Sequence, residues 1–275
     1  MIAKSDRPIG MFDSGIGGLT VLNALQKLLP NEKVVYFGDT ARLPYGDKSA
    51  ETILRYSIEN SIFLMEHRIK ALVIACNTAS SVAVEKLGQL FNIPVIGVIQ
   101  PGAEKAAKVT KNGHIAVLGT RGTIQSGAYE KELRARLPEG NIISIACPLF
   151  VHLIEEGFHN HPASHLIIAD YLRPLKDAKV DTLLLGCTHY LALEKAIRNY
   201  LGDEIAIVDS ASTCAEKIEE ILTQEKIRSA SKEKVSHLFY ASDNPEKFRL
   251  LGQKFMESEL PSVNFPQTFS IPQTT

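Results

Sequence analysis

Short runs of apolar residues alternate along the chain with longer segments whose apolar positions recur every three or four residues. The short runs predict strands and the longer segments predict amphipathic helices. Most of the runs are unbroken, as expected of parallel strands that are covered on both faces. We expect strands at Ile9–Phe12, Val34–Phe37, Ala71–Ala75, Val95–Val98, His114–Leu118, Ile142–Ala146, Thr182–Leu185, Ile205–Val208 and His237–Tyr240.

Helices are expected between these strands, and the alternation sets the fold class. Strands that alternate with helices imply right-handed crossovers and an α/β fold with mainly parallel sheets. From Pro261 on, the chain is polar and without a helical period, so we expect a segment that is extended over the surface or partly disordered. The clearest helices are Gly18–Leu29, Ala50–His67, Ala79–Leu90, Ile124–Leu137, Pro162–Lys176 and Ser212–Gln224.

Two stretches of the chain resemble each other, and each ends in a cysteine. Residues 71–78 read ALVIACNT and residues 182–189 read TLLLGCTH, so Cys76 and Cys187 follow apolar runs and precede hydrogen-bonding side chains. Residues 115–122 are also a loose echo of the turn near Asp13. The chain is therefore expected to contain two similar halves, each with one glycine-containing turn and one cysteine turn.

A boundary between two domains is expected near Pro94–Pro101, where a strand gives way to Gln-Pro-Gly. A return crossing near Val208–Ser210 would leave the last segment to complete the first domain. The predicted domains are residues 1–97 with 208–275, and residues 98–207.

Composition narrows the class of protein. The chain has 275 residues, 45% hydrophobic and 22% charged, which is enough for two domains, and its net charge of -1 gives no support for a nucleic-acid partner. We expect no membrane span, because no apolar run is long enough, and no secretory signal in Met1–Gly18. Four cysteines without a signal favour a reducing compartment, so the cytoplasm is expected.

The matched cysteines suggest two acid/base groups that face one substrate from opposite sides. A free thiol has a pKa of about 8.5 and needs a neighbour to become a thiolate at neutral pH. Asp13 could reach Cys76 from the first strand end, and His189 follows Cys187 by two residues. The alternative for each cysteine is a buried structural role. We expect that role for Cys147 and Cys214, which lack polar followers.

The turn from Asp13 through Ser14 to Gly18 follows a strand and opens a helix. Such a turn can present backbone N–H groups to an anion, or it can serve only for tight packing. A dinucleotide-binding turn is a weaker alternative, because Thr20 stands where the third glycine belongs, although Asp39 could bind a ribose.

Further polar residues follow other strands. The loop Pro44-Tyr45-Gly46 is either a simple turn or a source of N–H groups for a substrate carboxylate. Asn77, Thr78 and Thr188 could hold the remaining polar atoms of a small zwitterion. The histidines between 152 and 165 lack partners at a familiar metal spacing, so we expect solvated loop histidines. Either Glu155 or Glu156 could orient His189.

Together these motifs resemble those of the glutamate racemases, which are cofactor-independent amino-acid racemases. The resemblance covers most of the chain. Two departures are Leu191 and His152, which stand where prolines are common in that family. The motifs are Asp13–Gly18, Pro44–Gly46, Ala75–Ala79, Gly119–Thr123, Gly186–Tyr190 and Val208–Ser210.

The resemblance implies two α/β domains, each a doubly wound and mainly parallel sheet, related by pseudo-twofold symmetry around an interdomain active-site cleft. It implies that Cys76 and Cys187 are the catalytic bases, that Asp13 assists Cys76, and that His189 with Glu155 assists Cys187. No cofactor and no metal are implied. The substrate contacts implied are Asp13, Ser14, Pro44, Tyr45, Gly46, Asn77, Thr78, Thr188 and His189.

The same resemblance implies interconversion of L- and D-glutamate, which supplies D-glutamate for peptidoglycan in a bacterial cytoplasm. It leaves a homodimer open, because nothing in the sequence fixes an interface. Alternatives from other classes are a nicotinamide-dependent oxidoreductase and a two-domain binding protein that closes on an amino acid. An aspartate racemase is the close alternative, and the Thr-His pair after Cys187 favours glutamate over it.

Overall fold

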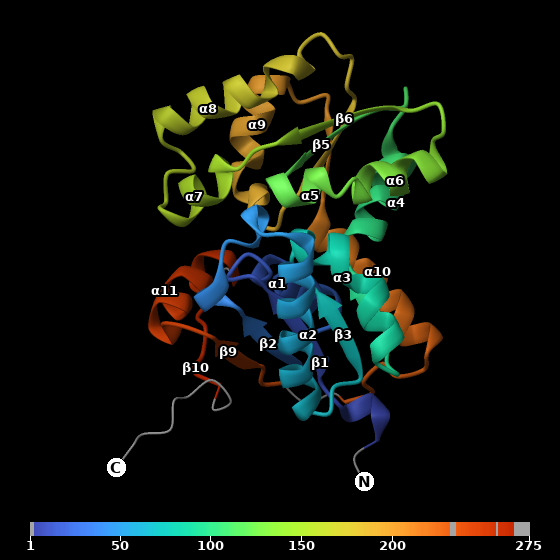
Figure 1. Ribbon diagram of the computed structural model, residues 1–275, viewed down its shortest axis with the longest axis vertical. Helices are drawn as coiled ribbons and strands as arrows, with labels where there is room; N and C mark the ends of the chain where they lie inside the picture. Colours follow the sequence, from blue (N-terminus) through green and yellow to red (C-terminus); the bar gives the residue numbers. More distant parts are fainter. Residues whose placement is uncertain (1–2, 232–234, 257, 267–275) are drawn as a thin grey trace.

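The computed structural model describes residues 3–231, 235–256 and 258–266. Two parallel sheets, each flanked by helices, form the two halves of an α/β molecule (Figure 1). The strand order of the first sheet is β10-β9-β2-β1-β3-β4, and the order of the second is β6-β5-β7-β8. The two sheets thus share the doubly wound arrangement that the sequence predicts.

The strand bounds agree with the expected runs to within a residue or two. The first sheet consists of β1 (Ile9–Asp13), β2 (Val34–Gly38), β3 (Ala71–Ile74), β4 (Val95–Gly97), β9 (Leu238–Ala241) and β10 (Val263–Asn264). The second consists of β5 (His114–Gly119), β6 (Asn141–Ala146), β7 (Thr182–Gly186) and β8 (Ala206–Asp209). The strand β10 comes from the polar tail and pairs in parallel with β9. The rest of that tail, from residue 267, lies outside the described residues.

Helices cover both faces of the sheets (Figure 1). Short 3₁₀ turns occur at Lys4–Asp6, Thr40–Arg42, Tyr45–Asp47, Arg173–Leu175 and Tyr190–Leu193. The α-helices are α1 (Leu19–Leu28), α2 (Ala50–Glu66), α3 (Asn77–Leu90), α4 (Ile99–Val109), α5 (Arg121–Gln125), α6 (Ala128–Arg136), α7 (Leu149–Glu155), α8 (Pro162–Leu172), α9 (Glu194–Leu201), α10 (Ser210–Gln224) and α11 (Pro245–Met256).

One predicted helix is wrong. The segment Ile124–Leu137 is divided into α5 and α6, and the break lies at Ser126 and Gly127. Gly127 has a φ of 65°, in the left-handed region that glycine adopts without a steric penalty. The helical spacing of apolar residues continues across this turn, so the sequence pattern predicts one helix where the structure has two.

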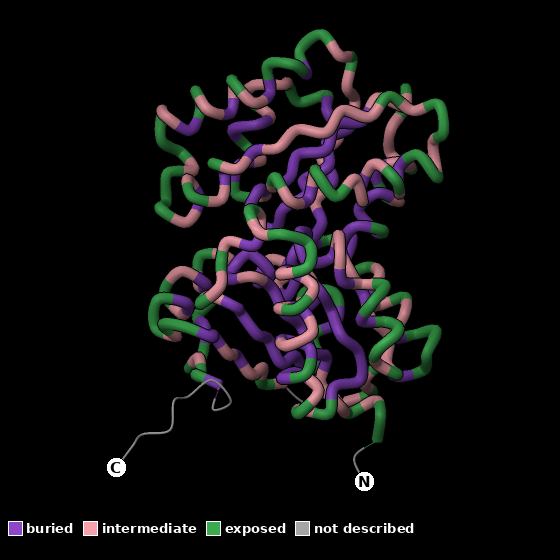
Figure 2. The backbone as a smooth tube through the Cα atoms, viewed as in Figure 1, coloured by how far each residue is buried: buried purple, intermediate pink, exposed green. Residues whose placement is uncertain are grey.

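The central strands are buried on both faces, which explains their unbroken apolar sequences (Figure 2). Along β1, Ile9 and Met11 pack into one apolar cluster while Phe12 packs into the cluster on the opposite face. Along β7, Leu183 and Leu184 divide between two clusters in the same way. Full burial of such a side chain contributes about 1.5–3 kcal/mol, so both faces help to hold each sheet in place.

The chain passes between the two sheets twice. It leaves β4 through Val98 into α4, and it returns from β8 through Asp209 into α10. The Asp209 carboxylate caps α10 by accepting hydrogen bonds from the backbone N–H groups of Ala211 and Ser212. Within the described part of the chain, no helix has the length and apolar character needed to cross a membrane.

Candidate active site

The carboxyl ends of strands from both sheets meet at one small cavity. Ligands bind outside such strand ends in doubly wound sheets. The cavity has a volume of about 40 Å³, and all twelve of the site residues predicted from the sequence line it. These are Asp13, Ser14, Pro44, Tyr45, Gly46, Cys76, Asn77, Thr78, Glu155, Cys187, Thr188 and His189.

Cys76 lies between the end of β3 and the start of α3. Its Sγ accepts a hydrogen bond from the backbone N–H of Ala79 as the N-cap of that helix, and it lies 3.7 Å from Ser14 Oγ. Burial, together with the nearby charge of Asp13, raises the pKa of the Cys76 thiol to about 12. The thiol is therefore neutral in this closed arrangement, and it can act as a proton donor.

Asp13 ends β1 and is buried beside Cys76. Its Oδ1 accepts the backbone N–H of Gly15 at 2.9 Å, and burial raises its pKa. The backbone N–H of Gly15 is therefore bonded to the aspartate of its own turn. The turn also packs tightly against the second sheet, because a Cβ at Gly17 would overlap Thr188 and His189.

Cys187 follows β7 and has a different set of neighbours. The Sγ of Cys187 lies 4.0 Å from Nδ1 of His189, and Nε2 of His189 lies 3.1 Å from Oε1 of Glu155 at the end of α7. Glu156 is exposed, so Glu155 is the carboxylate that orients the imidazole. Phe255 of α11 lies edge-on to the His189 ring, with centroids 5.4 Å apart.

The hydrogen bond between His189 and Glu155 shifts the pKa values of both groups in the direction that favours their charged forms. Although burial opposes a charge there, the hydrogen bonds to Cys187 and Glu155 raise the pKa of His189 to about 10. Burial also opposes ionisation of Glu155, but the bond to His189 lowers its pKa overall. Cys187 therefore lies beside an imidazole that is protonated at neutral pH.

The loop with Tyr45 and Gly46 forms one wall of the cavity. The Tyr45 ring is buried and its hydroxyl bonds to the carboxylate of Asp39, which also accepts from Arg42 and Ser242. Asp39 is therefore fully buried and occupied by protein partners, so it offers no carboxylate to a ribose. A dinucleotide-binding site would therefore lack the acidic residue that was expected to bind the ribose.

Thr78 of α3 reaches across to the other half of the molecule. The Thr78 hydroxyl lies 2.9 Å from that of Thr120 and 3.1 Å from that of Thr123. Thr120 also lines the cavity, together with Gly15, Leu43 and Val151. Sequence reasoning assigned no contact to Thr120, although its glycine-rich motif echoes the Asp13 turn and could have indicated it.

The two thiols are expected to differ in reactivity toward iodoacetamide. Cys76 and Cys187 are 5% and 7% exposed, so access does not separate them. At pH 8 the Cys76 thiol is neutral, whereas a protonated His189 lies beside Cys187. Alkylation followed by peptide mapping should label Cys187 first.

The preference for Cys187 has two checks. Above pH 10, His189 loses its proton and the preference should shrink. In His189→Asn the preference should be lost at pH 8 as well. Faster labelling of Cys76 at pH 8 would contradict the charge distribution described above.

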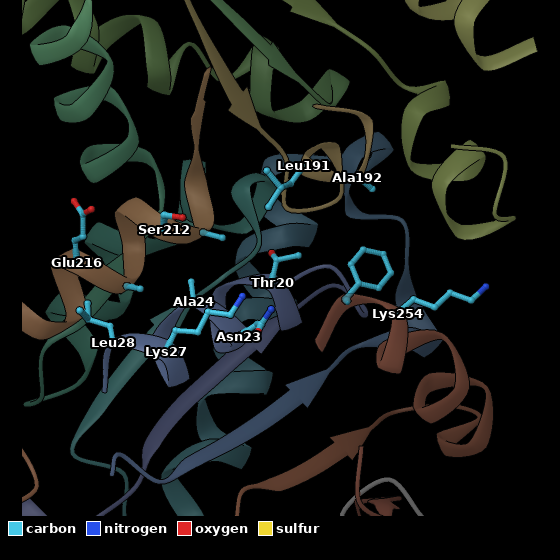
Figure 3. Close-up of a pocket in the computed structure, with 13 residues that line it drawn as sticks. Thr20, Asn23, Ala24, Lys27, Leu28, Leu191, Ala192, Ser212, Glu216 and Lys254 are labelled. Atoms are coloured by element: carbon cyan, nitrogen blue, oxygen red, sulfur yellow. The ribbon is translucent and has the colours of Figure 1, made fainter. Parts of the chain in front are cut away.

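A larger cavity lies behind the site. It has a volume of about 550 Å³ and lies between α1, α10, α11 and the 3₁₀ turn after His189 (Figure 3). Leu191, one of the departures noted in the sequence, lines it. None of the twelve predicted site residues does, so volume alone would misplace the site.

The histidine-rich segment does not assemble a metal site. Among the described residues, no group of three or more histidine, cysteine, aspartate or glutamate side chains could hold a metal ion. His159, His161 and His165 lie on or near the surface around the start of α8.

Comparison with known proteins gives one consistent result. The family model described as Asp/Glu/Hydantoin racemase matches residues 20–218. A glutamate racemase from Geobacter metallireducens is 48% identical over 257 residues, which cover 94% of this chain and 95% of that protein.

Solved structures agree with the sequence comparisons. A glutamate racemase from Bacillus anthracis superposes with a TM-score of 0.92 at 37% identity, covering 96% of this chain and 99% of that one. A Francisella tularensis glutamate racemase in complex with D-glutamate has a TM-score of 0.89 at 35% identity, covering 95% and 97% of the two chains.

Proposed function

This chain belongs to the Asp/Glu/Hydantoin racemase family, and we propose that it is a glutamate racemase that inverts its substrate by proton transfer between two thiols. The activity is an isomerisation of L- and D-glutamate. The observation that carries the mechanism is the placement of Cys76 and Cys187, from two different sheets, on one small cavity.

The mechanism follows from the unequal environments of the two sulfurs. A thiolate at Cys187, beside protonated His189, removes the α-proton from one face of glutamate. The neutral Cys76 thiol delivers its own proton to the opposite face. One C–H bond breaks and another forms, and the charge moves from one sulfur to the other. The reverse reaction uses the same steps with the roles exchanged.

The carbanionic transition state needs support, because an α-proton is far less acidic than a thiol. Hydrogen-bond donors aimed at the developing charge supply it in a cleft that excludes water. The backbone of Tyr45 and Gly46 and the hydroxyls of Ser14, Thr78 and Thr188 line the cavity from several sides. We assign these groups, with Pro44 and Asn77, to the substrate carboxylates and ammonium group.

The proposal places the enzyme in a bacterial cytoplasm, where D-glutamate is consumed in peptidoglycan synthesis. Its support is the set of glutamate racemase relatives and the four free cysteines, which suit a reducing compartment. We also retain the domain limits 1–97 with 208–275 and 98–207, and a homodimer as its assembly.

A direct assay tests the substrate and the need for a cofactor. The purified protein, without added pyridoxal phosphate or metal, is expected to convert L-glutamate to an equal mixture of enantiomers. It is expected to racemise L-aspartate about 100-fold more slowly. A hydrophobic or steric mismatch of one methylene is worth about 10- to 200-fold in discrimination. Chiral chromatography measures both reactions. Preference for L-aspartate would replace the proposal with an aspartate racemase.

A further inference from the structure

We propose that Tyr129 is a positioning residue, because its one side chain contacts the segments that carry both thiols. This inference rests on the proposed racemase mechanism. Tyr129 lies in α6, on the side of the second sheet, and its side chain is 2% exposed.

The hydroxyl of Tyr129 holds the Cys76 segment. It donates a hydrogen bond of 2.6 Å to Oδ1 of Asn77, the residue that directly follows Cys76. The same amide donates through Nδ2 to Ser210 Oγ at 3.1 Å, at the start of α10. Because Asn77 is the first residue of α3 and Cys76 is its N-cap, fixing this amide fixes the start of the helix that holds the thiol.

The ring of Tyr129 holds the Cys187 segment. A Cβ at Gly186 would lie 2.9 Å from Cε2 of Tyr129, so the ring packs directly on the backbone before Cys187. A Cβ at Gly102 of α4 would lie 3.4 Å from the same ring, which therefore lies between α4 and β7. The glycines leave room for this close approach, and Leu184 and Val117 pack into the same apolar cluster.

These two sets of contacts fix one sulfur relative to the other. The ring is fixed to the second sheet, and its hydroxyl reaches the first half of the molecule. Transfer of a proton from each face needs both sulfurs in reach of one carbon at the same time. A displacement of about 1 Å in such a site can cost about 100-fold in rate. Tyr129 thus acts through Asn77 and Gly186, and it need not touch the substrate.

The test is Tyr129→Phe, which keeps the ring and removes only the hydroxyl. We expect kcat to fall about 10- to 100-fold in both directions, with KM changed less than about threefold. With α-deuterated glutamate, the isotope effect on kcat should rise, because misplaced sulfurs make proton transfer more strongly rate-limiting. A purely structural role would lower the melting temperature without moving the isotope effect.

The matched control is Ser164→Ala in α8, on the same half of the molecule. Ser164 is fully buried and its hydroxyl donates to the Phe158 carbonyl at 2.6 Å, so this variant also loses one buried hydroxyl bond. We expect it to lose stability but to keep the original kcat and isotope effect. Identical kinetics in Tyr129→Phe and Ser164→Ala would overturn the proposal.

A second variant covers the case in which Tyr129→Phe does not fold. Ser210→Ala removes the other partner of the Asn77 amide, so it should lower kcat less and still raise the isotope effect. Unchanged kinetics in Ser210→Ala would then overturn the positioning role. The unmodified protein is assayed alongside. Its failure to racemise glutamate would end the proposed function and this inference together, whereas normal activity with unaffected variants would end only the inference.

Discussion

Replacing either Cys76 or Cys187 by alanine is expected to abolish measurable racemisation, with a loss of about 10⁴-fold. A single general acid or base contributes about 10²- to 10⁴-fold, and here each thiol is the only proposed group on its face of the substrate. Chiral chromatography measures racemisation, while proton NMR in D₂O follows deuterium entry at the α-carbon. In each single variant the remaining thiol still exchanges the α-proton on its own face of the substrate. Deuterium can therefore enter the α-position even when racemisation has stopped.

Cys214→Ala is the control for the loss of a buried thiol. Cys214 is fully buried in α10, and it packs into the apolar cluster of the first sheet. This variant should keep its activity and lose only the stability that a small cavity costs. Full racemisation in Cys76→Ala or Cys187→Ala would eliminate the two-thiol mechanism.

Gly17→Ala is expected to lower kcat/KM by about 100-fold or more, although Gly17 touches no substrate in the proposed mechanism. The added Cβ would overlap Thr188 Oγ1 and the Nδ1 edge of His189, which belong to the opposite half of the molecule. Either the halves move apart or His189 leaves Cys187, and displacements of about 1 Å are enough for a loss of that size. Steady-state kinetics on both enantiomers give the value.

Gly88→Ala provides the comparison for this change. Gly88 lies inside α3, and a Cβ there meets no atom within 4 Å. Alanine is favoured over glycine in a helix interior by about 1 kcal/mol, so this variant should be slightly more stable and fully active. Normal activity in Gly17→Ala would show that the two halves do not need this close approach.

The fold could be predicted because its central strands are buried on both faces. Apart from Asp13 at the end of β1 and Thr182 at the start of β7, these strands consist of apolar residues and glycine. Their order among the helices leaves few possible topologies. The site followed from the same argument, since residues at strand ends share one edge of a parallel sheet. The family motifs then supplied Tyr45 and Gly46, which no periodicity would have singled out.

Contacts between distant segments could not be predicted. Tyr129 and Asn77 are far apart in the sequence and lie on different halves, so no local pattern links them. Asp39 has the spacing of a ribose-binding acid, but only the fold shows that Arg42, Tyr45 and Ser242 occupy it. The break at Gly127 was missed because the apolar period continues through a glycine that turns the chain.

The unlike partners of the two sulfurs have a thermodynamic consequence. Mirror-image amino acids have equal free energies in water, so the equilibrium constant of the proposed reaction is one. The Haldane relation then requires kcat/KM to be identical for both enantiomers, however different Asp13 and His189 make the two sides. The asymmetry can appear only as a difference in kcat between the enantiomers that is matched by an equal ratio of their KM values. A mutation that alters one side must still leave kcat/KM equal for the two enantiomers.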